Sequence, residues 1–174
     1  MRRNCCDVEM EKRHATKEHP YVYRQSGLSA VLLSGIDLYY CPNCKAESPV
    51  IPRIAQLHES LAQEIIQLPR LLSGDEIKFL RKHAGLPAQQ FARLIGVTPE
   101  HLSRVENGHT KTFGKNTDRL IRAFTLTAKK GKEARKMLLG LAERLDGRAR
   151  RSKSVGISYA MKPRVGWQPI KQTA

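Results

Sequence analysis

The sequence predicts an α+β protein in which a small β module precedes a linker helix and an all-α domain. Three observations predict this organisation. Short β-prone runs occupy the first 50 residues, apolar residues at helical spacing begin at residue 51, and helix-capping residues recur after residue 71. We expect a β module over residues 1–50, a linker helix within 51–70, five helices over 71–146, and a basic, disordered tail over 147–174.

Composition and charge argue against several classes of protein. The chain has 174 residues, 40% of them hydrophobic, and its 31 Lys and Arg against 16 Asp and Glu give a formal charge of +15. Its apolar stretches are far shorter than the about 18 residues that a membrane span needs. Its first residues also lack the apolar segment of a secretory signal. A membrane protein, a secreted protein and a large enzyme are therefore not expected, and the charge favours an acidic polymer as partner.

The positive charge is concentrated in the last third of the chain. Residues 1–70 carry 9 basic and 8 acidic side chains, residues 71–110 carry 5 and 4, and residues 111–174 carry 17 and 4. We expect this last segment to hold phosphate without regard to sequence, with an affinity that falls as salt rises. The alternative is a solvated tail with no ligand. The middle of the chain is almost neutral, so its function must be inferred from its pattern.

The β module contains two or three short strands and a pair of cysteines. Residues 21–23 are β-prone, and apolar residues alternate over 36–40, as on one face of a strand. Strands this short bury little apolar area, so such a module usually needs additional stabilisation, which a bound metal could provide. Cys41 and Cys44 flank Pro-Asn in the C-x-x-C spacing typical of two metal ligands.

A complete tetrahedral site needs two more ligands. The other two cysteines are neighbours in sequence, and adjacent residues of an extended strand point to opposite faces. Both can bind one ion only if the backbone between them is irregular. The alternative is a lost or three-ligand site, with His14 or His19 as substitutes. The predicted zinc ligands are Cys5, Cys6, Cys41 and Cys44.

Residues 51–68 are expected to form the linker helix. Pro52 stands near its start and Pro69 ends it. Its apolar residues recur at steps of three and four and form a single stripe, which consists of Ile54, Leu57, Leu61, Ile65 and Leu68. We expect this stripe to pack against the neighbouring modules. The alternative is that it forms the seam of a dimer.

Capping residues place three helices between residues 73 and 108. The S-x-x-E capping box at 73–76 begins a helix that ends at His83. A second helix covers 87–95, and a third begins after its cap Thr98 and ends at Asn107. These signals predict two short helices joined by a tight turn.

Two further helices and a tail complete the prediction. A fourth helix begins near Asn116, and a fifth covers 132–145. After Gly147 the chain is too polar and basic to bury a core, so we expect it to be disordered. The only tryptophan, Trp167, lies in this tail.

Residues 85–108 have the pattern of a helix-turn-helix, a unit with which many proteins read DNA. Ala92 is small where the two helices must approach, and Gly96 permits the turn. The expected inner face consists of Phe91, Ala92, Ile95, Val97, Leu102 and Val105. The outer face of the third helix then presents Glu100, His101, Ser103 and Arg104.

The stretch from residue 77 to about 124 resembles the Cro/cI-type (XRE) helix-turn-helix family, most specifically in Leu-Ser-Arg-Val-Glu-Asn-Gly at 102–108. One departure is Ala88, where many members have Gln. The resemblance implies that the third helix enters the major groove and that Arg104 reads base edges, because arginine matches guanine O6 and N7. The alternative for Arg104 is an ion pair with Glu100, one helical turn back.

The predicted DNA contacts extend beyond that helix. The backbone at Gln89 and Thr98 is a candidate for phosphate contacts, since helix N-termini bind phosphate. Glu106 is expected to be structural. The full set of predicted DNA contacts is Gln89, Thr98, Glu100, His101, Ser103, Arg104 and Lys111.

The N-terminal part carries a second resemblance. Cys6 and the charged run that follows it, the Tyr-rich strands, Tyr40 to Cys44 and residues 51–58 look like the zinc-finger domain of MqsA/YgiT-type antitoxins. In that family this domain precedes an XRE helix-turn-helix. The family's first motif is C-x-x-C-G; with Cys6 as its second cysteine, Arg3 stands at the first and Asp7 at the glycine. Cys5 would then have to replace the missing first cysteine.

The two resemblances cover about residues 3–125 and imply a bacterial, cytoplasmic DNA-binding regulator. It would be a homodimer that binds a palindrome in its own promoter as a repressor, and it would hold a toxin through its N-terminal module. The alternative is a stand-alone XRE-type regulator whose N-terminal module docks another protein or senses metal. An enzyme is not expected, because H-x-E, H-E-x-x-H and G-x-S-x-G motifs are absent.

Overall fold

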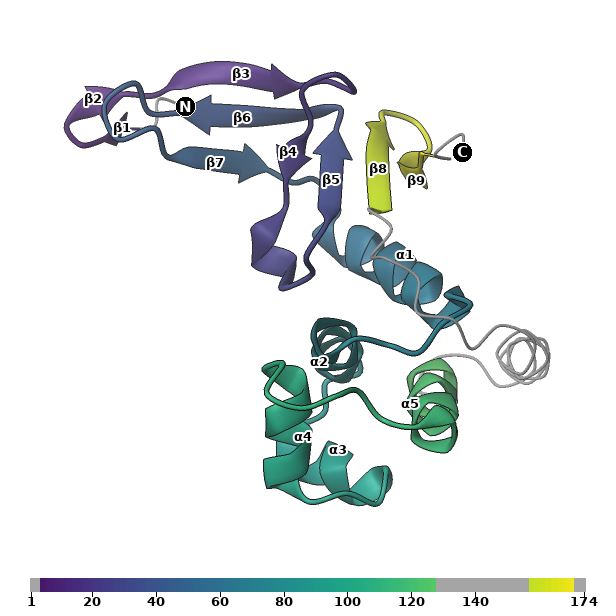
Figure 1. Cartoon of the computed structure of the whole chain (residues 1–174). Helices are drawn as coiled ribbons and strands as arrows, with labels where there is room; N and C mark the ends of the chain where they lie inside the picture. Colours follow the sequence, from purple (N-terminus) through teal and green to yellow (C-terminus); the bar gives the residue numbers. More distant parts are fainter. Residues whose placement is uncertain (1–3, 128–156, 171–174) are drawn as a thin grey trace. The chain divides into compact units, whose positions relative to one another are not determined.

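The computed structural model describes residues 4–127 and 157–170, and the chain divides into two compact units. One unit consists of residues 1–57 together with 154–174, and the other consists of residues 58–153. All strands of the described residues belong to the first unit, and helices α2 to α5 belong to the second (Figure 1). The predicted α+β class is confirmed. No helix in the described part of the chain could span a membrane.

The first unit begins with a hairpin and a three-stranded antiparallel sheet. The hairpin pairs β1 (Asn4–Cys5) with β2 (Val8–Glu9). The sheet has the order β3 (Glu11–Ala15), β6 (Ile36–Tyr40), β7 (Glu47–Val50), with β6 in the centre (Figure 1). Alternate residues of a strand share one face. The side chains that this sheet buries are therefore Ala15, Ile36 and Leu38.

A four-stranded sheet joins the two ends of the chain. Its order is β4 (Tyr21–Val22), β5 (Val31–Ser34), β8 (Ile157–Lys162), β9 (Gly166–Pro169). The β5–β8 pair is parallel and the other two pairs are antiparallel. The indole N–H of Trp167 donates to the carbonyl oxygen of Pro52 at 2.7 Å. The larger buried side chains of this sheet are Tyr21, Val31, Leu33, Tyr159 and Trp167.

The prediction of a disordered tail over 147–174 is wrong for residues 157–169, which form β8 and β9. A lone two-stranded hairpin is at best marginally stable in water, but here β8 pairs with β5 and Tyr159 is fully buried. Gly35 permits the close approach of β8, because a Cβ at this residue would lie 2.7 Å from the Met161 carbonyl oxygen. The predicted fifth helix over 132–145 lies outside the described residues.

The predicted linker helix is α1 (Ile54–Gln67), which runs from the first unit into the second. Leu57, Leu61 and Ile65 of its apolar stripe are fully buried, whereas Ile54 at its start is exposed. These three side chains are therefore buried in the described structure, and packing of the stripe against the neighbouring modules stays a prediction.

Besides most of α1, the described part of the second unit contains four further helices that the sequence predicted. They are α2 (Gly74–His83), α3 (Ala88–Leu94), α4 (Pro99–Glu106) and α5 (Lys115–Thr127). The capping box of α2 forms as predicted, since Ser73 accepts from the Glu76 N–H and the Glu76 carboxylate accepts from the Ser73 N–H. Such caps satisfy N–H groups that have no partner inside the helix.

A buried ion pair links α5 to the end of α1 and to the segment that follows it. Arg122 is fully buried, and its Nε donates to Asp118 one turn earlier at 2.7 Å. Its two terminal nitrogens donate to the carbonyl oxygens of Ile66, Leu68 and Arg70. Asp118 also accepts from the N–H of Leu72 at 2.7 Å. Every part of this guanidinium therefore has an acceptor, which a buried charge requires.

Two further arginine–carboxylate pairs support the ends of the helices. Arg70 pairs with Glu76 through two hydrogen bonds of 2.6 and 2.9 Å, so it holds the carboxylate of the α2 capping box. Arg81 of α2 pairs with Glu106 of α4 through two hydrogen bonds of 2.7 and 2.9 Å. Both members of the second pair are buried, which agrees with the structural role expected for Glu106.

Candidate functional sites

The helix-turn-helix core packs helices α3 and α4 against each other. Phe91 and Ala92 of α3 are fully buried, and so is Leu102 of α4. Gly96 adopts a φ of +72° in the turn, a left-handed conformation that glycine tolerates without strain. Five of the six predicted inner residues are buried, and Val97 in the turn is half-buried. The turn and the inner face therefore match the prediction.

Helix α4 presents its predicted outer face to solvent. Leu102, Val105 and Glu106 face inward, which leaves the other positions of this short helix pointing outward. Glu100, His101, Ser103 and Arg104 are all exposed. Within the part of the chain that the structure describes, Arg104 forms no ion pair with Glu100, so the guanidinium is available to a ligand.

The remaining predicted DNA contacts are also exposed. Gln89 lies at the start of α3, and Lys111 lies in the loop between α4 and α5. The Thr98 hydroxyl caps α4 by accepting from the His101 N–H at 3.2 Å. The His101 ring packs edge-on against Phe113, with ring centroids 5.2 Å apart. Contact of these residues with DNA stays a prediction.

Sequence reasoning missed two residues that support this face. Asn107, the residue that ends α4, donates from its side chain to the Ser103 hydroxyl, and Lys78 of α2 donates to the Asn107 side-chain oxygen. The i,i+4 spacing of Ser103 and Asn107 was a usable signal, since side chains four apart meet on a helix. The contribution of Lys78 depends on how α2 packs on α4.

The adjacent cysteines meet through a tight hairpin turn. Cys5 pairs with Val8, so Cys6 and Asp7 are the two central residues of the turn between β1 and β2. Both have positive φ, +52° and +59°, as the common type I′ hairpin turn requires. This is the irregular backbone that the sequence demanded. Aspartate adopts this conformation readily, whereas cysteine does so at some cost in strain.

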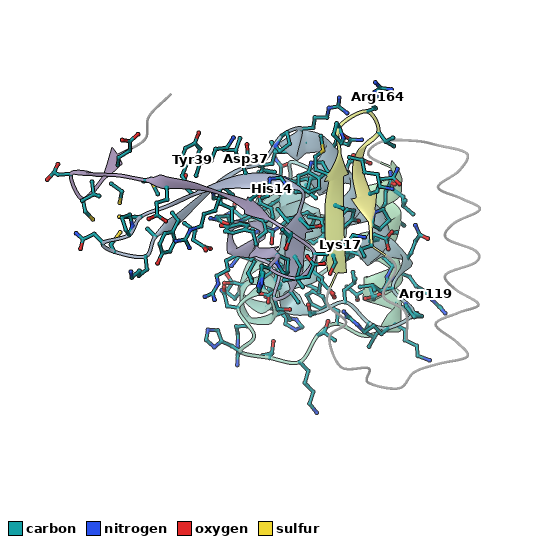
Figure 2. All side chains as sticks on the ribbon, turned by 90° about the horizontal axis from the view of Figure 1, so that it is seen from above. His14, Lys17, Asp37, Tyr39, Arg119 and Arg164 are labelled. Carbon is teal, nitrogen blue, oxygen red and sulfur yellow. The ribbon has the colours of Figure 1, made fainter. Side chains whose placement is uncertain are left out.

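The second pair of cysteines stands in a turn at the end of β6. The Cys41 N–H donates to the Ala46 carbonyl, and the Lys45 N–H donates back to the Cys41 carbonyl at 3.0 Å. The four cysteine sulfurs lie within 4.8 Å of one another. His14, labelled with Asp37 in Figure 2, lies on the β3–β6 sheet. It pairs with Asp37 at 3.1 Å, so it does not substitute for a cysteine.

The sulfur positions fit a tetrahedral metal ion. Metal–sulfur bonds of about 2.3 Å place the ligand sulfurs of a tetrahedron about 3.8 Å apart. The Cys5 sulfur lies 3.6 Å from that of Cys44 and 3.8 Å from that of Cys6. Four thiolates in this geometry suit zinc or an iron–sulfur centre. The four residues predicted as ligands are therefore brought together and can bind a metal ion.

Hydrogen bonds shift the pKa values of two thiols in the cluster in opposite directions. The Ala46 backbone and the neighbouring thiols lower the pKa of Cys44 to about 7. The hydrogen bond with Cys44 raises the pKa of Cys5 to about 12. Cys44 therefore ionises more readily than Cys5, and the thiolate is the form that binds metal.

Comparison with known proteins identifies one part of the chain. Residues 77–124 match the family model described as Helix-turn-helix. No curated protein and no solved structure matches the chain. The matched segment contains α3 and α4, and its similarity to XRE-type helix-turn-helix units supports a DNA-binding regulator.

The cysteine cluster yields a prediction for metal content. Protein purified without added metal should contain about one metal ion per chain, and Cys44→Ser or Cys5→Ser should lower this to less than about half, because each removes one of four ligands. Elemental analysis by mass spectrometry measures the ratio. Asp7→Asn is the control, since it changes a neighbour in the same turn and removes no sulfur. Wild-type protein with less than about half an ion per chain would contradict the metal site.

Proposed function

We propose that the protein is a sequence-specific transcriptional regulator that reads DNA with the outer face of α4. One observation carries this proposal. A helix capped at Thr98 buries Leu102 and Val105 on its inner side and leaves Ser103 and Arg104 exposed. A recognition helix needs this combination, because its inner side must be fixed before its outer side can read base edges. The family match over residues 77–124 supports the same role.

Arg104 is proposed to supply sequence preference. Its exposed guanidinium can donate two parallel hydrogen bonds to guanine O6 and N7, worth about 1–3 kcal/mol of discrimination. Gln89 and Lys111 would then contact phosphates on either side. As a homodimer the protein would place its two α4 helices about one turn of DNA apart and read a palindrome. It would act in the bacterial cytoplasm as a repressor.

We further propose that the protein is the antitoxin of a type II toxin–antitoxin pair and represses its own operon. What supports this is the order of its parts, a four-cysteine β module before an XRE-type helix-turn-helix, together with the resemblance of residues 3–58 to the zinc-finger domain of MqsA/YgiT-type antitoxins. The first unit would hold the toxin. Zinc bound by the four cysteines would clamp the β1–β2 hairpin to the turn after β6.

Arg104→Ala tests the DNA-reading role. On a duplex selected in vitro by the full chain, the substitution should weaken binding by about 1–3 kcal/mol and change binding to a scrambled duplex little. Fluorescence anisotropy measures both affinities. Arg24→Ala, at an exposed arginine of the first unit, should leave both unchanged. An equal loss on the two duplexes would show that Arg104 contacts only phosphate.

The antitoxin role has its own test. If the reading frame next to this gene encodes a small basic ribonuclease-like protein, the two chains should co-purify, and Cys41→Ser should reduce their association. A point substitution is preferable to deletion of residues 1–50, because that deletion would also remove the partner strand of β8. Absence of such a neighbour, or co-purification that is unchanged by loss of the cluster, would favour the stand-alone regulator.

A further inference from the structure

Ser103 on the outer face of α4 ends a chain of two hydrogen bonds that begins on α2. The Lys78 ammonium donates to Asn107 Oδ1 at 3.1 Å, and Asn107 Nδ2 donates to Ser103 Oγ at 3.3 Å. Asn107 is the C-cap of α4 and lies four residues after Ser103, a spacing at which side chains on a helix can meet. The three side chains belong to the second unit, and Asn107 and Ser103 are exposed.

The chemistry of these groups fixes the direction of both hydrogen bonds. An ammonium only donates, so the atom of Asn107 that faces Lys78 must be its oxygen. The amide nitrogen then faces Ser103, and because this nitrogen also only donates, Ser103 Oγ must accept. The serine hydroxyl hydrogen therefore takes part in neither of these two hydrogen bonds.

That hydrogen is free to point outward. Helical serines often donate to the carbonyl four residues earlier, which here belongs to Pro99. Among the described residues, Asn107 is the only hydrogen-bond partner of the Ser103 side chain. A serine hydroxyl normally donates or accepts as its ligand requires. Here Asn107 occupies one of the two acceptor lone pairs of Ser103 Oγ, and the hydroxyl hydrogen is left to donate.

We propose that Ser103 acts as a hydrogen-bond donor to an acceptor on DNA, and that Asn107 and Lys78 are positioning residues that set this polarity. The proposal rests on the DNA-reading role of α4. The acceptor is a purine N7 or carbonyl oxygen on a base edge, or a phosphate oxygen. The unused hydroxyl hydrogen would favour such an acceptor over the amino groups at cytosine N4 and adenine N6, which present donors in the major groove.

A mutant cycle tests this series of hydrogen bonds, with the duplex selected in vitro by the full-length protein. Ser103→Ala should weaken binding about three- to tenfold, the effect of one hydrogen bond, and Ser103→Thr should retain the donor and the affinity. Asn107→Ala should weaken binding in the wild-type background and have no further effect on Ser103→Ala, because it acts only through the hydroxyl. Additive losses would overturn the positioning role.

Reversal of the polarity gives a sharper test. In Asn107→Asp the carboxylate accepts from both Lys78 and Ser103, so the hydroxyl hydrogen turns inward. Asn107→Asp should therefore weaken DNA binding more in the wild-type background than in a Ser103→Ala background. The Ser103→Ala background measures the effect of the added negative charge alone. Equal losses in the two backgrounds would show that only charge matters and would overturn the proposal.

Modified duplexes identify the acceptor without relying on the fold of a variant. A scan with 7-deazapurines removes each N7, base analogues without the exocyclic carbonyl remove each O6 or O4, and methylphosphonates remove the charge of each phosphate. One substitution should weaken wild-type binding and leave Ser103→Ala binding unchanged, and its type distinguishes base from phosphate. If no substitution behaves in this way, the proposal is wrong. A wild-type chain that enriches no duplex would instead refute the DNA-reading role itself.

Discussion

The buried Arg122–Asp118 pair organises the helical unit on which the proposed function depends. A charge removed from water is costly unless opposite charge and hydrogen-bond acceptors surround it. Here the Asp118 carboxylate and three backbone carbonyls surround the guanidinium. Those carbonyls belong to the chain between residues 66 and 70, so the same side chain that anchors α5 also fixes how the chain leaves α1.

The position of the reading helix follows from this anchor. Asp118 holds the N–H of Leu72, immediately before the capping box that begins α2. Helix α2 in turn holds α4 through the buried Arg81–Glu106 pair. Packing of Leu102 then leaves Ser103 and Arg104 exposed. Specificity for DNA would therefore be carried by an almost neutral segment, while the +13 of residues 111–174 would add only an attraction to phosphate.

Local signals predicted the helices and the outer face of α4, whereas contacts between remote segments escaped prediction. Caps such as Thr98 act within three residues, so the sequence displays them directly. Arg122 looks like any surface arginine in the sequence, because its carbonyl partners lie more than 50 residues earlier. The C-terminal strands were missed for the same reason, since β8 acquires its partner β5 only in the folded chain. The cysteine cluster was predicted from the C-x-x-C spacing of Cys41 and Cys44, but the turn that lets Cys5 and Cys6 join it became visible only in the backbone.

The unfolding free energy of Arg122→Met tests most directly whether this pair holds the helical unit together. Urea titration followed by helical circular dichroism should show a loss of about 3–5 kcal/mol, because Asp118 would be left buried without its partner. The exposed Arg93→Met on α3 should change stability by less than about 0.5 kcal/mol. The double variant Arg122→Met with Asp118→Leu should recover much of the loss, since it leaves no unpaired charge. A loss for Arg122→Met no larger than that for Arg93→Met would contradict the account.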